Sequence, residues 1–239
     1  MIPKKIHYCW FGHGEMPQLI RDCIASWHKY MPDWEYRMWN EDNFDINSTP
    51  YTKEAYEAKK YAFVSDYVRL WALEREGGLY LDVDMEVRQP FNPLIIHKAF
   101  AGFEGSKHLP VMMAVCASEP HGLWVKEMLD AYLDRHFILE DGKYDLTTNV
   151  QFITAIMTAG GFRQDGTEQN YRDLHIFPVD YFSPRQTTGE YIQTSNTFCE
   201  HKGLNSWGGV QSPWKRFVVD LVGPRFTPGL IKFKRRLFG

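Results

Sequence analysis

Residues 65–86 read SDYVRLWALEREGGLYLDVDME, and this stretch carries the most informative pattern in the chain. Its first half has the apolar spacing of a helix, and the glycine pair at 77–78 predicts where that helix ends. The apolar run that follows predicts a strand over 79–84. Because alternate residues of a strand point to the same face, we expect Asp82 and Asp84 to present both carboxylates on one side.

Two carboxylates held this close repel each other unless a positive charge neutralises them. A divalent cation is the natural neutraliser, since hard cations prefer carboxylate oxygens, and a sugar-nucleotide diphosphate would bring the same cation. Asp82 and Asp84 therefore predict a metal-dependent enzyme that acts on a phosphorylated donor. The alternative is a pair of solvated loop carboxylates, because a D-x-D triplet is common by chance.

The composition is that of a globular protein with one sizeable core. The 239 residues are 44% apolar and 24% charged, and the net charge of −3 argues against a nucleic-acid partner. Residues 213–239 hold seven Lys or Arg and one acid, a charge of +6, which leaves −9 for the rest of the chain. We expect a catalytic domain over 1–212 and a basic tail over 213–239.

Cysteine spacing and the chain ends predict a cytoplasmic protein. The four cysteines show no C-x-x-C pairing, so neither a disulfide framework nor a zinc site is expected. The first ten residues lack the apolar stretch of a signal peptide, and no uncharged run approaches membrane-spanning length. The end of the tail, GLIKFKRRLFG over 229–239, mixes apolar and cationic residues. It predicts either peripheral contact with the inner face of the plasma membrane or a solvated terminus.

Strands and helices alternate along the chain. This alternation predicts an α/β domain whose site lies at the carboxyl ends of its strands. Strands are expected at 5–11, 35–39, 79–84, 99–103, 112–117, 174–178 and 197–201, and helices at 17–30, 52–76 with a break near 59–60, 122–135 and 149–159.

Three polar or aromatic residues are further candidates, two on the helix expected at 52–76 and one at the end of the first strand. Asp66 and Arg69 are three positions apart and share a helix face. They form either a surface ion pair or a pair facing the metal end of the sheet, where Arg69 would contact phosphate or sugar. Trp10 ends the first strand, where a tryptophan either packs in the core or stacks on a nucleobase.

A late segment pairs candidate metal ligands with an aromatic residue. His201 and Ser206 offer ligand atoms, and Trp207 precedes the flexible glycines at 208–209. Taken alone, this pattern is weak, because a single histidine more often has a structural role than a metal-binding one.

Together these pieces resemble glycosyltransferase family 32, the D-x-D sugar transferases, which include yeast initiating mannosyltransferases and bacterial capsule and O-antigen transferases. The block G-G-x-Y-x-D-x-D after S-D-x-x-R is highly specific, and the ends are moderately so. The resemblance follows the family's order over roughly residues 1–210. The matching residues are Ile2-Pro3-Lys4 with Ile6-His7 and Trp10, Ser65-Asp66 with Arg69, Gly77 to Asp84, and His201 followed by Ser206-Trp207.

The resemblance implies a GT-A fold, a central mixed sheet flanked by helices, with a nucleotide-sugar donor and Mn²⁺ or Mg²⁺ as cofactor. In the family, the match of Trp10 stacks near the base, and the match of Asp84 binds the metal directly. The late loop closes over the diphosphate. The residues so implied are Asp82, Asp84, Arg69 and Trp207 for catalysis; Trp10, Asp66, Arg69, Tyr80, Asp82, Ser206 and Trp207 for the donor; and Asp84, Asp82, His201 and Ser206 for the metal.

Two positions depart from the family pattern. Many relatives have two adjacent histidines in the late segment, whereas here His201 is followed by Lys202. Many also have Gly-Pro after a threonine in the middle region, whereas here Thr148 is followed by Asn149 and Val150. Since that region tends to lie near the acceptor, we expect a different acceptor or a different acceptor pose.

We therefore expect a retaining, metal-dependent glycosyltransferase that moves a hexose from a nucleotide sugar to a glycan acceptor. UDP-sugars are favoured over GDP-mannose, and capsule or O-antigen synthesis, with a lipid-linked acceptor, is the expected setting. The leaving phosphate helps to deprotonate the acceptor, so no protein base is nominated. The alternatives are a non-catalytic nucleotide-sugar-binding module and a nucleotidyltransferase. The latter would usually show a Gly-rich basic loop after the first strand, and residues 12–15 are a poor one.

Overall fold

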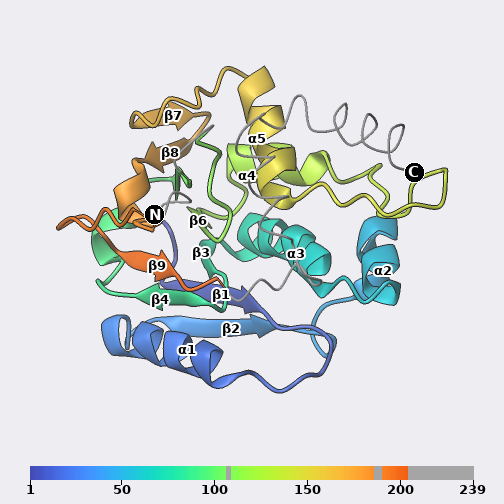
Figure 1. Ribbon diagram of the computed structural model, residues 1–239, viewed down its shortest axis with the longest axis horizontal. Helices are drawn as coiled ribbons and strands as arrows, with labels where there is room; N and C mark the ends of the chain where they lie inside the picture. The colour runs from blue at the N-terminus through green and yellow to red at the C-terminus, as the bar shows by residue number, and fades with distance from the viewer. Residues whose placement is uncertain (106–108, 186–189, 204–239) are drawn as a thin grey trace.

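The computed structural model describes residues 1–105, 109–185 and 190–203, and these residues form a mixed α/β fold (Figure 1). The expected alternation of strands and helices is confirmed. The strands are β1 Lys5–Cys9, β2 Glu35–Trp39, β3 Gly78–Leu81, β4 Met85–Val87, β5 Ala99–Gly102, β6 Val115–Ser118, β7 Gln169–Tyr171, β8 Leu174–Phe177 and β9 Cys199–His201. The α-helices are α1 Gln18–Tyr30, α2 Pro50–Glu57, α3 Tyr61–Glu76, α4 Leu123–Asp130 and α5 Asn149–Ala159, and short 3-10 turns cover Ile46–Ser48, Asn92–Leu94 and Val179–Tyr181.

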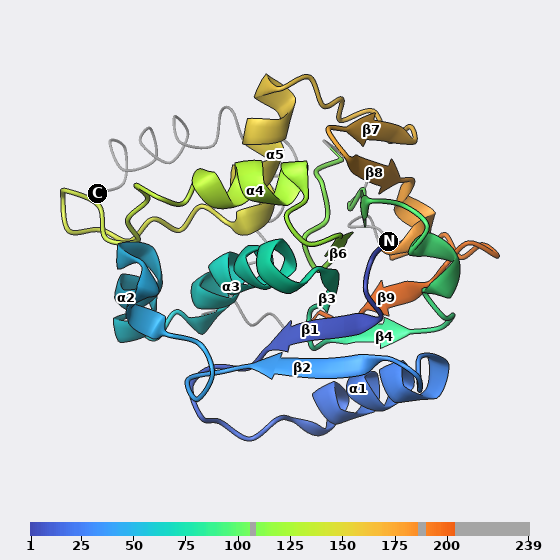
Figure 2. The ribbon, with the colours of Figure 1, turned by 180° about the vertical axis from the view of Figure 1, so that it is seen from behind.

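Seven strands form one mixed sheet in the order β2-β1-β3-β6-β5-β8-β7. β1 runs parallel to β2 and β3, whereas β6 runs antiparallel to β3 and β5. The carboxyl ends of β1, β3 and β5 therefore share one edge of the sheet. β4 and β9 form a separate antiparallel ribbon next to this edge, and both views show them side by side (Figures 1 and 2).

Two apolar cores cover the two faces of the sheet. In β3, Tyr80 packs into the core shared with α3, α4 and α5, while Leu79 and Leu81 pack into the core shared with Trp27 of α1. This is the period of two that a strand buried on both faces requires. Each fully buried large side chain contributes about 2 kcal/mol to folding.

The glycine pair after α3 is required by close packing. Gly77 ends the helix with a φ of +61°, and Gly78 follows with a φ of +111°, in the region that favours glycine. A Cβ on Gly78 would lie 2.6 Å from the backbone oxygen of Lys5. Nε2 of the buried His7 lies 2.7 Å from the oxygen of Gly77, and its Nδ1 accepts from Trp39 at 3.0 Å. Burial lowers the pKa of His7, so a neutral imidazole joins the helix end to β1 and β2.

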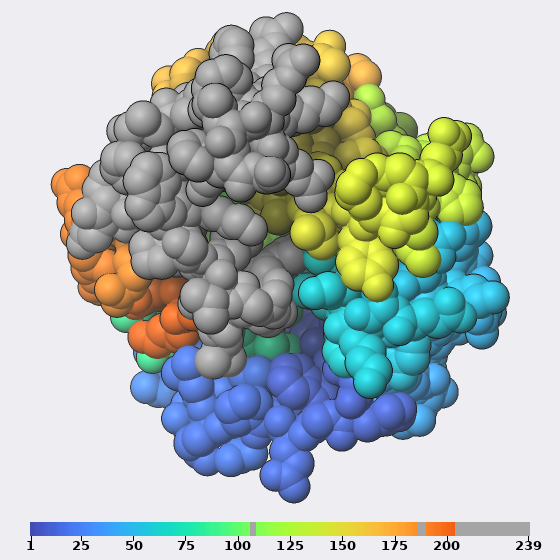
Figure 3. Space-filling model, turned by 45° about the vertical axis from the view of Figure 1, so that its right-hand side comes forward, coloured from blue at the N-terminus to red at the C-terminus, as the bar shows by residue number. Residues whose placement is uncertain are grey.

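The segment after α4 differs from its expectation. A helix was expected over 122–135, but α4 ends at Asp130 and short turns follow. The reason lies in Arg135, which turns inward: its guanidinium carbon is 3.9 Å from the centre of the Phe152 ring and Nη2 is 2.9 Å from Asp145. Figure 3 shows the yellow-green surface of this segment against α2, where Glu54 accepts from backbone nitrogens 137 and 138.

Several short elements were missed or displaced. β4 and β7 were not expected, and the strand expected at 112–117 is Val115–Ser118. Strands of three residues are too short for an alternation to be recognised in the sequence. The expected domain boundary after 212 and the basic tail lie outside the described residues. Within the part that the structure describes, no helix is both long and apolar enough to span a membrane.

Candidate active site

The two aspartates lie in a tight turn beyond β3. The strand ends at Leu81, and the backbone nitrogen of Met85 donates to the oxygen of Asp82 at 3.0 Å. The expected strand over 79–84 is therefore wrong in its last three residues, and the carboxylates do not share a strand face. The reason is that β4 must reverse direction to pair with β9, and aspartates suit such a turn.

Asp82, Asp84 and His201 nevertheless converge. Each offers one ligand atom, and these atoms all lie within 4.8 Å of one another. His201 arrives on β9, whose pairing with β4 sets it opposite Met85. Its Nε2 lies 3.0 Å from Oδ1 of Asp84, a residue 117 positions earlier. Of the metal residues expected from the sequence, the structure brings these three together. Ser206 lies outside the described residues.

Asp66 and Arg69 form a buried ion pair behind the turn. Nη2 of Arg69 lies 2.9 Å from Oδ1 of Asp66 and 3.3 Å from Oδ1 of Asp82. The side chains of Asp66 and Arg69 are 0% and 4% exposed, so the surface-pair interpretation is wrong. Because Arg69 also contacts Asp82, the pair lies at the end of the sheet that carries the carboxylate turn.

The remaining contacts of Arg69 are made with the protein itself. Nη1 donates to the backbone oxygen of Met113 at 2.5 Å, and the guanidinium carbon lies 4.5 Å from the centre of the Tyr80 ring. The hydroxyl of Tyr80 in turn donates to Oδ1 of Asp82 at 2.9 Å. Arg69 and Tyr80 therefore orient Asp82 from two sides, and a donor phosphate would have to compete with these contacts.

The charges of the site perturb one another strongly. Burial raises the pKa of Asp66 to about 7, although Arg69 opposes the shift. Burial disfavours a charged Arg69, but Asp82 and Asp66 outweigh it and raise its pKa well above the usual value. Burial also opposes protonation of His201, yet Asp84 raises its pKa to about 9. Such mutual perturbation is typical of functional sites.

Glu104 belongs to the same group of charges and was not singled out in the sequence. Burial and the charge of Asp82 raise its pKa to about 7, while His201 and Arg69 oppose the shift. It follows β5, whose carboxyl end lies at the same sheet edge as that of β3. The signal available in the sequence was an acidic residue directly after the strand expected at 99–103.

Two buried oxygens near Arg69 have no hydrogen-bond partner among the described residues. They are Oδ2 of Asp66 and Oδ1 of Asn149. Thr148 caps α5 and sets Asn149 in its first turn, where Nδ2 donates to the backbone oxygen of Asp66 at 3.2 Å. The hydroxyl of Tyr132 and Nη1 of Arg135, which interact electrostatically with Asp66, also have no hydrogen-bond partner among the described residues, so both donors and acceptors are left over in this buried region.

Trp10 follows β1 at the same sheet edge and is partly buried. Its indole nitrogen donates to the backbone oxygen of Gly14 at 2.6 Å, which holds the ring on its own loop. No described contact joins it to Asp82, Asp84 or His201, so its role toward a nucleobase stays a prediction. Trp207, like Ser206, lies outside the described residues, and the closing loop stays a prediction too.

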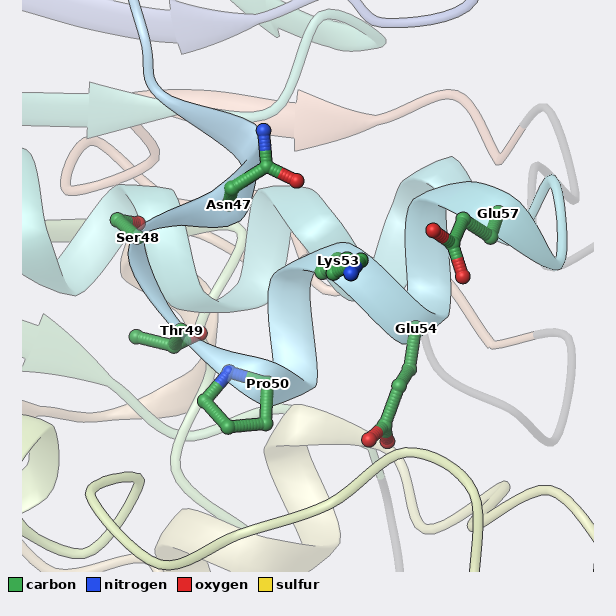
Figure 4. A pocket seen from close by; sticks show the side chains of 7 residues that line it. All are labelled: Asn47, Ser48, Thr49, Pro50, Lys53, Glu54 and Glu57. Carbon is green, nitrogen blue, oxygen red and sulfur yellow. The ribbon is translucent and has the colours of Figure 1, made fainter.

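A hollow of about 400 Å³ lies elsewhere, at the start of α2 (Figure 4). It shares no residue with the carboxylate cluster. Figure 4 shows Lys53, Glu54 and Glu57 along one helix and Thr49 and Pro50 at its start. Thr49 caps this helix by accepting from the nitrogen of Thr52 at 3.1 Å, which is a structural role. We therefore place the candidate active site at the carboxylate cluster and not at the hollow.

Comparison with known proteins agrees with this geometry. Residues 17–101 match the family model "Glycosyltransferase sugar-binding region containing DXD motif", a range that includes Asp66, Arg69, Asp82 and Asp84. The solved structure of the PaToxG glycosyltransferase superposes with a TM-score of 0.52 at 17% identity, covering 66% of this chain and 69% of that one. The expected GT-A fold is thereby confirmed.

Two curated relatives match shorter stretches. "Subversion of eukaryotic traffic protein A" of Legionella pneumophila is 30% identical over 117 residues, which cover 38% of this chain and 18% of that protein. "Inositol phosphoceramide mannosyltransferase 3" of Schizosaccharomyces pombe is 30% identical over 103 residues, which cover 41% of this chain and 29% of that protein. The matches thus span well under half of these relatives. Residues 17–101, which contain the D-x-D turn, thus match a glycosyltransferase sugar-binding region.

Proposed function

We propose that this chain transfers a hexose from a nucleotide sugar to a glycan acceptor in a metal-dependent reaction. The observation that carries the proposal is the convergence of Asp82, Asp84 and His201, whose ligand atoms lie within 4.8 Å of one another. Two carboxylates and one imidazole suit Mn²⁺ well and Mg²⁺ when water and diphosphate oxygens complete the shell. The residues present therefore fit the cation that the fold implies.

A cation held there would stabilise the negative charge that develops on the leaving diphosphate. The chain's own residues prepare the site for that step. Arg69 and Tyr80 fix the orientation of Asp82 by contacts at 3.3 and 2.9 Å. We propose that Asp66, whose Oδ2 has no hydrogen-bond partner among the described residues, contacts hydroxyl groups of the bound sugar. We propose a retaining course without a protein base, in which the leaving phosphate assists deprotonation of the acceptor.

The donor and the acceptor are proposed at the level of class. UDP-sugars remain favoured, and the relative named as an inositol phosphoceramide mannosyltransferase adds weight to GDP-mannose. Capsule or O-antigen synthesis with a lipid-linked acceptor remains our proposal for the setting, together with a cytoplasmic location. Contact of residues 213–239 with an anionic membrane is proposed on the charge of that tail alone.

The alternatives fit the structure less well. A non-catalytic binding module would be expected to lose its metal ligands, whereas Asp82, Asp84 and His201 stay together. A nucleotidyltransferase needs open backbone nitrogens after β1 to bind phosphate. The nitrogen of Gly12 already donates to Glu41 at 2.5 Å, which places a carboxylate where a phosphate would sit.

The test is a hydrolysis screen with UDP-glucose, UDP-galactose, UDP-N-acetylglucosamine and GDP-mannose, each with Mn²⁺, with Mg²⁺ and with excess chelator. We expect hydrolysis of one donor that requires the added cation. Full activity in the chelator would refute metal dependence. Absence of hydrolysis and of donor binding by calorimetry, for every donor and cation, would refute the transferase proposal.

A further inference from the structure

The ribbon that carries His201 is short, and its backbone ladder fixes its register over only a few residues. β4 and β9 pair over three residues each, with Met85, Glu86 and Val87 opposite His201, Glu200 and Cys199. Isolated two-stranded pairs are marginal, and a slip by one residue turns every side chain to the other face. Such a slip would turn His201 away from Asp84. Burial of Met85, Val87 and Cys199 in the core favours the observed register on one face of the ribbon, and the charged residues on the other face can add to that support.

Glu200 supplies the first part of that support. Its side chain is 1% exposed, although it is a carboxylate. Oε1 accepts from Nε and Nη2 of Arg185 at 3.0 and 2.7 Å, and Oε2 accepts from the hydroxyl of Tyr191 at 2.9 Å and from Arg88. Both carboxylate oxygens are thus saturated, which is what allows the charge to be buried.

The same contacts join β9 to β4 and to the segment that precedes β9, which carries Arg185 and Tyr191. Arg88, directly after β4, also lies 3.2 Å from Glu86 and donates to Tyr191 at 2.6 Å. Lys202, directly after β9, lies 2.9 Å from Glu86. These ion pairs and hydrogen bonds bridge the two strands. We name the group that makes them the ribbon clamp; its members are Glu86, Arg88, Arg185, Tyr191, Glu200 and Lys202.

We propose that Glu200 is a positioning residue for the cation site, acting through the ribbon clamp to hold β9 in the register that sets His201 against Asp84. The inference rests on the proposed function for its metal readout. Successive residues of a strand point to opposite faces, so Glu200 engages the clamp while His201 turns to the carboxylate turn. In a slipped register, Glu200 or Lys202 would take the place of His201, with loss of the imidazole ligand.

The experiment uses the full chain and the variant Glu200→Gln, which keeps the shape and removes the charge. Mn²⁺ affinity is measured by calorimetric titration without donor. Partners that orient metal ligands typically alter metal affinity by about 10- to 100-fold, and we expect a loss of about tenfold. The matched control is Glu140→Gln, an exposed glutamate remote from the ribbon, which should leave the affinity unchanged.

The double variant Glu200→Gln/His201→Ala separates positioning from general destabilisation. If Glu200 acts through His201, the charge removal has no further effect on Mn²⁺ affinity once the imidazole is gone. An equal loss in both backgrounds, or no loss in the single variant, would overturn the proposal.

Amide hydrogen exchange gives a readout that does not depend on the metal. The backbone nitrogen of Lys202 donates to the oxygen of Asp84 at 2.9 Å, so its exchange reports the ribbon register. We expect faster exchange at 199–202 in Glu200→Gln and also in Arg185→Met, which removes the 62% exposed side chain that donates both bonds to Oε1 of Glu200. Unchanged exchange in both variants overturns the clamp. If the wild type binds no Mn²⁺ but the variants still exchange faster than the wild type at 199–202, the metal proposal is overturned and the role of the ribbon clamp in holding the register stands.

Discussion

The two aspartates and the histidine of the cluster are held by different means. Asp82 is oriented by Arg69 and Tyr80, which precede it by 13 positions and by two. His201 reaches Asp84 across 117 positions, on a ribbon of three-residue strands fastened by ion pairs. One part of the site is thus built by its own helix and strand, and the other by a distant pairing. The local part should be robust, and the distant part should respond to changes in the ribbon.

The largest effect is expected from removing Asp84, because this residue belongs to the carboxylate turn and also contacts the distant His201. We expect Asp84→Ala to lower transfer by at least a hundredfold, because a metal contributes several kcal/mol of charge stabilisation in such reactions. Mn²⁺-dependent donor binding should disappear, while the thermal melt stays cooperative. Steady-state kinetics and calorimetry measure both effects, with Asp134→Ala at an exposed site as the control. Wild-type turnover in the Asp84 variant would remove this residue from the site.

Breaking the buried pair comes next in size. Arg69→Met leaves two carboxylates, Asp66 and Asp82, without their cation, and such losses cost about 3–5 kcal/mol. Urea unfolding at neutral pH measures the cost. Adding Asp66→Asn should recover part of it, and more at pH values above about 7, where Asp66 would otherwise be ionised without its partner, than below. If Arg69→Met alone is as stable as the wild type, the pair does not contribute to the fold.

The pH dependence of stability follows from Asp66. Burial raises its pKa from the usual 3.8 to about 7, so the folded state favours the protonated form. That contribution is fully present below about pH 4 and is lost as the pH rises through about 7. Relative to Asp66→Asn, the wild type should therefore lose stability between these limits and change little above them. Unfolding by urea at four pH values measures the difference, and parallel curves for the two proteins would contradict it.

The smallest effect is expected at Tyr80. Tyr80→Phe removes the hydroxyl that donates to Asp82 at 2.9 Å but keeps the ring under Arg69. We expect a stability change of about 1 kcal/mol and a loss of Mn²⁺ affinity below tenfold. Compared with Glu200→Gln, a smaller effect on the metal would support the view that the local part has redundant supports. A larger loss of Mn²⁺ affinity in Tyr80→Phe than in Glu200→Gln would show that the local part of the site is the more sensitive one.

Much of the fold could be read from local patterns. The helix break near 59–60, the end of α3 at Gly77, and the bounds of β2 and α5 all follow from spacing and terminal residues. The turn at 82–84 could not be read in this way, because the strand ends only where β4 must leave to meet β9. The burial of Asp66 and Arg69 was equally hidden, since a helix face does not reveal what packs against it.

The sequence by itself therefore determined the helix, the glycine pair, the apolar strand and the paired aspartates, because each depends on dihedral preferences and periods within a few residues. Only the tertiary structure decided that His201 joins Asp84, that Glu104 approaches the same charges, and that Glu200 is buried among arginines. The physical reason is that pairing between short, distant strands is selected by the packing of the whole sheet. No single segment of this 239-residue chain determines which distant strands pair.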